Sequence, residues 1–409
     1  MSEMNWIRTS LSFAAFSCLL CFSSCEEERA ALKDKDKDPK PPVSTGFYFG
    51  ADLSYANQVM DRGGVFKGGG KAGNPYQILK DHGASLARFR LWHNPVWTRE
   101  VYGDQDAQMY NDLKDVEKSL KEAAALGMMT LLDFHYSDSW ADPGKQVAPH
   151  AWKDIKSLEV LKDSAYQYTK NTLVYLHAKE VLPDMVQLGN EINCGMLTSG
   201  AEAGFPALDV CDNGWNSFGA VMNEAIRAVR EVEEIAGKKI AIILHVADPK
   251  NADWWFSNAM QNGGITDFDM IGLSYYPLWH RTIPLDGLSE TIASLISKFK
   301  KETIVLETAY PWTTEGADNY HNIMGGEEPL SGFPFTKEGQ LNLLKALTQE
   351  IIDGGGSGVV YWEPAWISSG MKDLWGTGSS WENCALFDFE GNALPAMDYM
   401  NANYSKTID

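Results

Sequence analysis

The 409-residue sequence is poor in several features that define common protein classes. It has 35 Lys and Arg against 55 Asp and Glu, and the net charge of −20 argues against a nucleic-acid partner, because such binding relies on cations that neutralise phosphates. No Cys-x-x-Cys pair follows residue 25, which argues against a zinc site. The apolar run Leu11–Phe22 is too short to span a bilayer comfortably, and no repeat or second domain stands out.

The N-terminus reads as an export signal. Arg8 precedes the apolar run, and Phe22-Ser23-Ser24-Cys25 resembles a lipoprotein cleavage site, which predicts lipidation of Cys25. Residues 26–45 are charged and Pro-rich and predict a flexible tether, and their first acidic residues resemble the signal that sends lipoproteins to the cell exterior. We therefore expect a signal peptide over 1–25, a tether over 26–45 and a barrel over 46–405. The chain would be anchored to the outer membrane and touch it only through lipid. The alternative is ordinary cleavage and secretion.

Three cysteines follow Cys25. Cys194 and Cys211 share a loop-rich stretch, and an oxidising location permits a disulfide between them, although spacing does not prove one. Cys384 would then be a lone buried thiol.

From residue 46 onward, short apolar runs alternate with amphipathic stretches eight times, which is the pattern of a single (β/α)8 TIM barrel. Helices are expected over 111–126, 215–236 and 337–352, each followed closely by glycine. The predicted strands are 47–53, 86–91, 129–135, 185–189, 240–245, 270–275, 303–306 and 358–362. A doubly wound open sheet is the alternative, but the glycines at 68–70 lack the form of a phosphate loop after the first strand.

Polar and aromatic residues gather at the predicted carboxyl ends of these strands, where barrels place their chemistry. Such a rim suits a sugar, whose faces stack on flat rings and whose hydroxyls bond polar edges. The predicted substrate-binding residues are Asp52, Arg90, His135, Asp138, Trp140, Asp142, Asn190, His245, Tyr275 and Trp362. Asp52, Arg88 and Arg90 also fit salt bridges that only support the site, and Trp362 also fits the core.

Two glutamates at this rim predict glycoside hydrolysis. Glu191 ends the fourth predicted strand and Glu307 ends the seventh, so they can meet across a barrel mouth. Retaining hydrolysis needs one acid and one nucleophilic carboxylate, about 5–5.5 Å apart. Asn190 would bond the sugar 2-hydroxyl, and Tyr275, or else Tyr276, would donate to Glu307.

The chain resembles the family 53 endo-β-1,4-galactanases from about Gly50 to Met397. The motifs that carry this resemblance are Arg88-Phe89-Arg90-Leu91-Trp92, Asp133-Phe134-His135-Tyr136, Gly189-Asn190-Glu191, Ser274-Tyr275-Tyr276-Pro277, Glu307-Thr308-Ala309-Tyr310 and Tyr361-Trp362-Glu363-Pro364. The resemblance implies cleavage of internal bonds in galactan and type I arabinogalactan, with Glu191 as acid/base and Glu307 as nucleophile. We expect a monomer with no catalytic cofactor.

Some of these relatives hold a structural calcium ion between the loops after strands seven and eight. The matching oxygen donors here are Asp318, Asn319, His321, Ser379 and Glu382, although Ala317 and Tyr320 interrupt the acidic pattern.

Other functions stay open from sequence alone. The nearest is an endo-mannanase or endo-glucanase with the same two glutamates, and a weaker one is an exo-acting galactosidase. A non-catalytic glycan-binding lipoprotein is a different class, but binding alone would need neither Glu191 nor Glu307.

Overall fold

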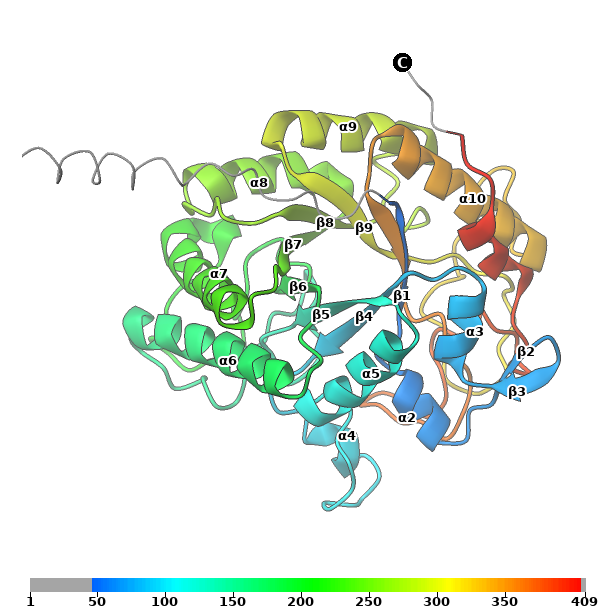
Figure 1. The fold of residues 1–409 in the computed structure, drawn as a ribbon, viewed down its shortest axis with the longest axis horizontal. Coiled ribbons are helices and arrows are strands. Elements are labelled where there is room, and N and C mark those ends of the chain that lie inside the picture. The colour runs from blue at the N-terminus through cyan, green and yellow to red at the C-terminus, as the bar shows by residue number, and fades with distance from the viewer. Residues whose placement is uncertain (1–45, 406–409) are drawn as a thin grey trace, which may run out of the picture. The chain divides into compact units, whose positions relative to one another are not determined.

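The computed structural model describes residues 46–405, and its centre is a closed barrel of eight parallel strands (Figure 1). The strands are β1 (Tyr48–Asp52), β4 (Leu86–Leu91), β5 (Met129–Phe134), β6 (Met185–Leu188), β7 (Ala241–Ala247), β8 (Met270–Ser274), β9 (Glu302–Thr308) and β10 (Gly358–Tyr361). Each pairs with the next along the chain, and β1 closes the barrel against β10. This confirms the predicted TIM barrel, with strand bounds within two residues of those expected.

Helices surround the barrel (Figure 1). They are α2 (Ala56–Asp61), α3 (Pro75–Asp81), α4 (Trp97–Glu100), α5 (Leu113–Ala125), α6 (Leu158–Ala178), α7 (Trp215–Ala236), α8 (Ala252–Gln261), α9 (Leu288–Phe299) and α10 (Lys337–Asp353). Local chemistry sets their ends: Asp112 and Thr336 cap α5 and α10 by accepting backbone N–H bonds, and Gly237 ends α7 at φ 62°. The three predicted helices are confirmed within two residues.

Shorter elements complete the chain. A hairpin of β2 (Phe66–Gly68) and β3 (Lys71–Gly73) was not predicted, and Gly69 and Gly70 form its turn at positive φ. The 3-10 turns are η1 (Val210–Asp212), η2 (Pro249–Asn251), η3 (Leu285–Gly287) and η4 (Pro395–Asn401).

The strands bury both faces, but the two faces differ in chemistry. Successive side chains of a strand point to opposite sides, so one set faces the helices and the other fills the barrel. In β4, Ala87, Phe89 and Leu91 belong to the apolar core, whereas Arg88 and Arg90 between them are buried polar groups. The same alternation buries Asp133 of β5, Gln187 of β6, His245 of β7 and Ser274 of β8. A polar interior therefore lies beneath the carboxyl ends of the strands.

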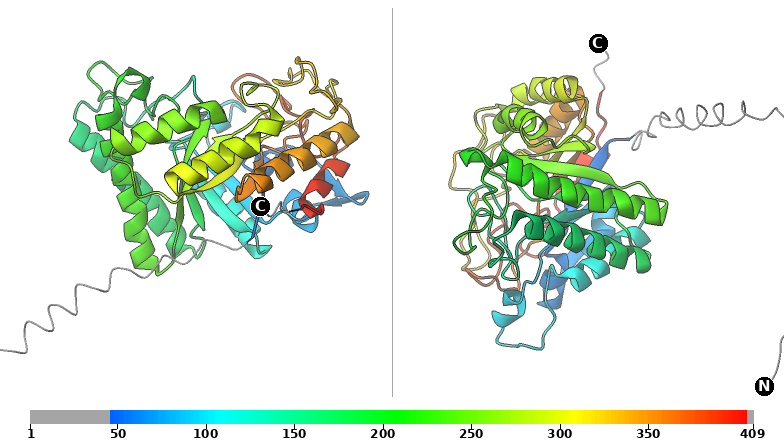
Figure 2. Two further views of the ribbon diagram at one scale, coloured as in Figure 1. Left: turned by 90° about the horizontal axis from the view of Figure 1, so that it is seen from above. Right: turned by 90° about the vertical axis from the view of Figure 1, so that its left-hand side faces the viewer.

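The long loops gather at one end of the barrel in both views of Figure 2. They include the segments between β6 and α7 and between β9 and α10. Among residues 46–405, no helix is long and apolar enough to cross a membrane. The predicted signal peptide, Cys25 and the tether lie outside the described residues.

Candidate active site

Glu191 and Glu307 meet at the loop end of the barrel. Glu191 is the third residue after β6, and Glu307 lies near the carboxyl end of β9. One carboxylate oxygen of each residue lies within 4.8 Å of the other, and both side chains are buried. This is the short separation typical of retaining hydrolysis, because inverting enzymes keep about 6.5–9.5 Å for a water molecule.

Glu191 sits in a setting that favours its protonated form. Burial raises the pKa of Glu191 well above its usual value, and the negative charge of Glu307 raises it further. The Ser274 hydroxyl donates to Glu191 Oε1 at 2.6 Å and opposes this shift. His245 supports Ser274 through Nε2 at 2.9 Å, while its Nδ1 accepts the Glu191 backbone N–H at 3.3 Å. Burial and Arg88 lower the pKa of His245, so the ring stays neutral.

Glu307 has stronger support for a negative charge. Burial raises the pKa of Glu307 to about 7, and the Arg88 guanidinium, 2.9 Å from Oε1, and the Tyr276 hydroxyl, which donates to Oε2 at 2.9 Å, limit this rise. Glu191 receives one hydroxyl bond, whereas Glu307 receives a hydroxyl bond and a cation. The asymmetry leaves the shared proton on Glu191.

Arg88 connects several buried polar groups at the barrel mouth. Its Nη1 binds Asp52 at 2.7 Å, its Nη2 binds Asp133 at 2.9 Å and Asn190 Oδ1 at 2.8 Å, and its Nε binds Gln187 at 3.1 Å. These groups come from the ends of several strands, so one fixed fork of donors sets the geometry of the whole barrel mouth.

A cleft of about 600 Å³ opens above the two glutamates. Tryptophans form much of its wall, and consecutive ring centroids lie 5.6 Å apart from Trp140 to Trp362, 4.8 Å from Trp362 to Trp381 and 6.1 Å from Trp381 to Trp279. Trp375 also lines the cleft and is 60% exposed. Flat rings beside buried carboxylates suit a carbohydrate chain.

Six of the ten predicted substrate-binding residues line the cleft. They are Arg90, His135, Trp140, Asp142, Asn190 and Trp362. His135 has little capacity left for a sugar, because its Nε2 contacts Asp133 at 3.0 Å and its Nδ1 receives the Trp92 indole and the Ala141 backbone N–H.

The other four predicted substrate-binding residues, Asp52, Asp138, His245 and Tyr275, do not line the cleft. Asp52 is fully buried against Arg88 and Ser54, and His245 lies behind Glu191. Asp138 accepts the backbone N–H groups of Asn94 and His150 and so braces loops outside the cleft.

Tyr275 is also corrected, because its hydroxyl donates to the Ile283 carbonyl at 2.9 Å. The neighbouring Tyr276, considered as the alternative, is the donor to Glu307. Adjacent residues at a strand end point to opposite sides, so only one tyrosine of the pair can face the barrel axis.

Sequence reasoning missed Ser274 and the cleft tryptophans Trp375 and Trp381. Ser274 could have been found, because it lies two residues before Tyr276 and so shares its side of the strand. Trp375 and Trp381 lie on loops, where no periodicity says which way a side chain points.

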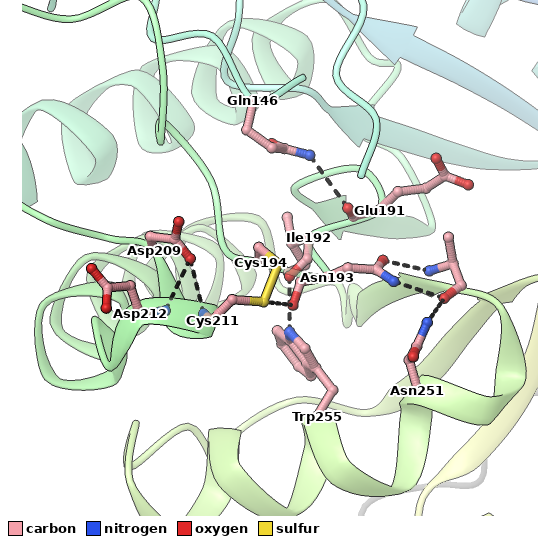
Figure 3. Close-up of a disulfide and its surroundings, with 11 residues drawn as sticks. Gln146, Glu191, Ile192, Asn193, Cys194, Asp209, Cys211, Asp212, Asn251 and Trp255 are labelled. Carbon is pink, nitrogen blue, oxygen red and sulfur yellow. Dashed lines mark hydrogen bonds between the residues drawn. A yellow bond between two sulfur atoms is a disulfide. The ribbon is translucent and has the colours of Figure 1, made fainter. Parts of the chain in front are cut away.

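The loop that carries Glu191 is held by several bonds (Figure 3). Cys194 and Cys211 form the disulfide that was considered, while Cys384 is a buried free thiol in the described part of the chain. The Gln146 amide donates to the Glu191 carbonyl, and Asn193 exchanges two 2.8 Å bonds with Ala247. Glu191 itself has a φ of 46°, a conformation that these contacts maintain.

Within residues 46–405, few side chains are arranged so that they could bind a metal ion. Two groups of side chains in this range are close enough to hold a metal ion. The first is Glu191, His245 and Glu307, whose polar atoms already bind one another or neighbouring residues. The second contains the sulfurs of Cys194 and Cys211, which are joined in the disulfide. The predicted calcium residues fit poorly as a set. Asp318 accepts the backbone N–H groups of Tyr320 and Ser379, Ser379 Oγ donates to Trp366, and Asn319 and His321 are exposed. Glu382 Oε2, by contrast, is buried without a hydrogen-bond partner among the described residues.

The sequence and the structure are both similar to those of family 53 glycosyl hydrolases. The sequence model for glycosyl hydrolase family 53 matches residues 48–400. The arabinogalactan endo-β-1,4-galactanase of Cellvibrio japonicus is 43% identical over 366 residues, covering 88% of this chain and 92% of that protein. The endo-β-1,4-galactanase of Bacillus subtilis is 32% identical, covering 87% and 85%. Among solved structures, the GH53 catalytic domain of Ignisphaera aggregans has a TM-score of 0.77 at 34% identity and covers 90% of this chain and 99% of that chain.

Replacing Tyr276 by Phe should raise the lower of the two apparent pKa values of the glutamate pair. The hydroxyl bond stabilises ionised Glu307, so its loss should move that pKa upward by about one unit. Carboxyl ¹³C chemical shifts followed against pH measure the change. Tyr275→Phe is the matched control and should leave both values in place. An unchanged titration in Tyr276→Phe would contradict the role of this bond.

Proposed function

The chain belongs to glycosyl hydrolase family 53, and from this premise we propose that it cleaves internal β-1,4-galactosidic bonds of galactan and type I arabinogalactan with retention. The observation that carries this proposal is the short separation of Glu191 and Glu307 beneath a cleft lined with tryptophan. The names of relatives at 43% and 32% identity supply the galactan specificity.

The first step transfers the sugar to the protein. Ionised Glu307 attacks the anomeric carbon while Glu191 gives its proton to the departing glycosidic oxygen, so the carbon–oxygen bond breaks as an ester to Glu307 forms. Arg88 and Tyr276 hold Glu307 in place for this attack. Burial beside Glu307 keeps Glu191 protonated until the leaving group needs the proton.

The second step releases the sugar. Once Glu307 is esterified, its negative charge is gone, so the pKa of Glu191 falls and Glu191 acts as a base. It takes a proton from water, the resulting hydroxide attacks the anomeric carbon, and the bond to Glu307 breaks. Both glutamates return to their starting states, and no cofactor takes part in either step.

The arrangement also weighs against the other functions. A non-catalytic glycan-binding protein has no use for two buried carboxylates within 4.8 Å and with opposite support for charge. An endo-mannanase or endo-glucanase would share this geometry. Only the oligosaccharides released from galactan, mannan and cellulose distinguish these enzymes from a galactanase.

Glu191→Gln and Glu307→Gln should each reduce turnover of pectic galactan by at least about 10³-fold while leaving galactan binding in place. Wild type should release long oligosaccharides early, which a time course of products on galactan, mannan and cellulose measures. A variant with wild-type activity would remove that glutamate from its role. No galacto-oligosaccharides from galactan would refute the substrate, and monosaccharide as the first product would indicate exo action.

We also propose that the mature chain is a monomer tethered to the outer membrane by lipid on Cys25 and facing the cell exterior. The motif at residues 22–25 and the acidic run after it support this proposal. Cys25→Ala should abolish incorporation of labelled fatty acid and release the activity into the medium, whereas Cys384→Ala should change neither. Full labelling of Cys25→Ala would contradict the anchor.

We also propose a structural calcium ion between the loops after β9 and β10, which keeps Glu382 from the predicted ligands and adds Asn322. Glu382 Oε2 and Asn322 Oδ1 are buried acceptors without a partner among the described residues, and both residues lie against Gly316. Calcium prefers such oxygens and would stabilise the loops.

Chelation with EDTA should therefore lower the melting temperature of wild type by a few degrees, and added calcium should restore it. Glu382→Gln should be insensitive to both treatments, while the exposed-site control His321→Ala should respond like wild type. An identical melting temperature of wild type with EDTA and with calcium would contradict the proposal.

A further inference from the structure

A second buried ion pair lies under the aromatic wall of the cleft and has no part in the two chemical steps. Arg90 Nη2 is 2.7 Å from Glu363 Oε1, and the side chains are 1% and 0% exposed. Glu363 directly follows Trp362 and has a φ of 47°, so the backbone turns at this point in a conformation that few non-glycine residues adopt.

Aromatic rings surround the Arg90 guanidinium. Its central carbon lies 4.0 Å from the ring centre of Trp140, 4.2 Å from that of Tyr55 and 5.1 Å from that of Trp92. Within residues 46–405, neither Arg90 Nε nor Arg90 Nη2 makes a hydrogen bond, so the contact with Glu363 is an ion pair without hydrogen-bond alignment. Ring faces thus take the place of the acceptors that a buried guanidinium normally has, and the attraction is directional because the guanidinium is planar.

The pair also joins the two sides of the wall. Trp140 follows β5, whereas Trp362 follows β10, and their ring centroids are 5.6 Å apart in the lining of the cleft. Arg90 contacts the first side through the ring of Trp140. Glu363 is covalently next to Trp362 and accepts the Tyr55 backbone N–H at 3.3 Å.

We propose that Arg90 and Glu363 are positioning residues, which hold Trp140 and Trp362 as one rigid sugar-binding surface. The proposal deepens the function proposed above and rests on it for the identity of the sugar. Arg90 was predicted to bind substrate, but it acts here through the rings that cover it.

The catalytic glutamates have a separate support. Arg88 binds Glu307, and Ser274 binds Glu191. The Arg90 backbone N–H donates to Ser54 Oγ at 2.9 Å, but the Arg90 side chain pairs with Glu363 and not with either catalytic glutamate. Loss of the Arg90 side-chain charge or shape should therefore weaken sugar binding and leave the proton chemistry in place.

Arg90→Lys keeps the charge but removes the planar fork, and Glu363→Gln keeps the shape but removes the charge. Each should raise the KM for galactan about tenfold or more, change kcat by less than about threefold and leave both limbs of the pH profile in place. Arg230→Lys is the matched control, because Arg230 pairs with Glu233, Asp267 and Asp269 away from the cleft. It should lower the melting temperature without changing KM.

A double-mutant cycle tests whether the ion pair acts through the rings. Trp140→Phe alone should raise KM, and adding Glu363→Gln should raise it by much less than in the wild-type background. An unchanged KM in folded Arg90→Lys and Glu363→Gln would overturn the proposal. Shifted pH limbs with a large fall in kcat, or full additivity in the cycle, would overturn it as well.

A measurement without substrate separates this proposal from the function on which it rests. With 5-fluorotryptophan in the protein, Glu363→Gln should shift or broaden the ¹⁹F resonances of Trp140 and Trp362, while Arg230→Lys should not. Failure of wild type to bind galactan, with the resonances perturbed, would refute the substrate alone. Unperturbed resonances in folded Glu363→Gln would refute the positioning role, and if that variant does not fold, the same criterion applies to Arg90→Lys.

Discussion

The Arg88 guanidinium organises the buried charges of the barrel mouth. It is 1% exposed and contacts Asp52, Asp133 and Glu307 together with the amide oxygens of Gln187 and Asn190. Burying three carboxylates in an apolar shell would be prohibitive without a cation, and arginine keeps its charge at any physiological pH. The positions of Glu307 and of Asn190, next to Glu191, therefore depend on one side chain that takes no part in bond making.

The difference between the two glutamates arises from their neighbours. Glu307 receives the Arg88 cation and the Tyr276 hydroxyl, whereas Glu191 receives the Ser274 hydroxyl and faces the charge of Glu307. Two identical side chains thus differ in how readily they lose a proton, and the pKa is raised further for Glu191 than for Glu307. The same charge coupling reverses the role of Glu191 after Glu307 becomes an ester.

The two arginines of β4 have different roles, although both face the barrel interior because alternate residues of a strand point to the same side. Arg88 and Arg90 of β4 both point into the barrel, two positions apart in sequence and one layer apart in depth. The deeper one binds the carboxylates, while the outer one lies among Tyr55, Trp92 and Trp140 with Glu363 as its partner. Chemistry and sugar binding are in this way supported by separate ion pairs.

The sequence by itself determined the barrel, the bounds of its strands and the placement of Glu191 and Glu307, because apolar periodicity and strand ends are local properties of the chain. Only the tertiary structure decided that Tyr276 and not Tyr275 binds Glu307, that His245 and Asp52 lie behind the cleft, and that loop tryptophans such as Trp375 line it. Such choices depend on which side a residue faces at a strand end or in a loop, and there the periodic pattern stops. The contacts that decide them come from residues far apart in the chain.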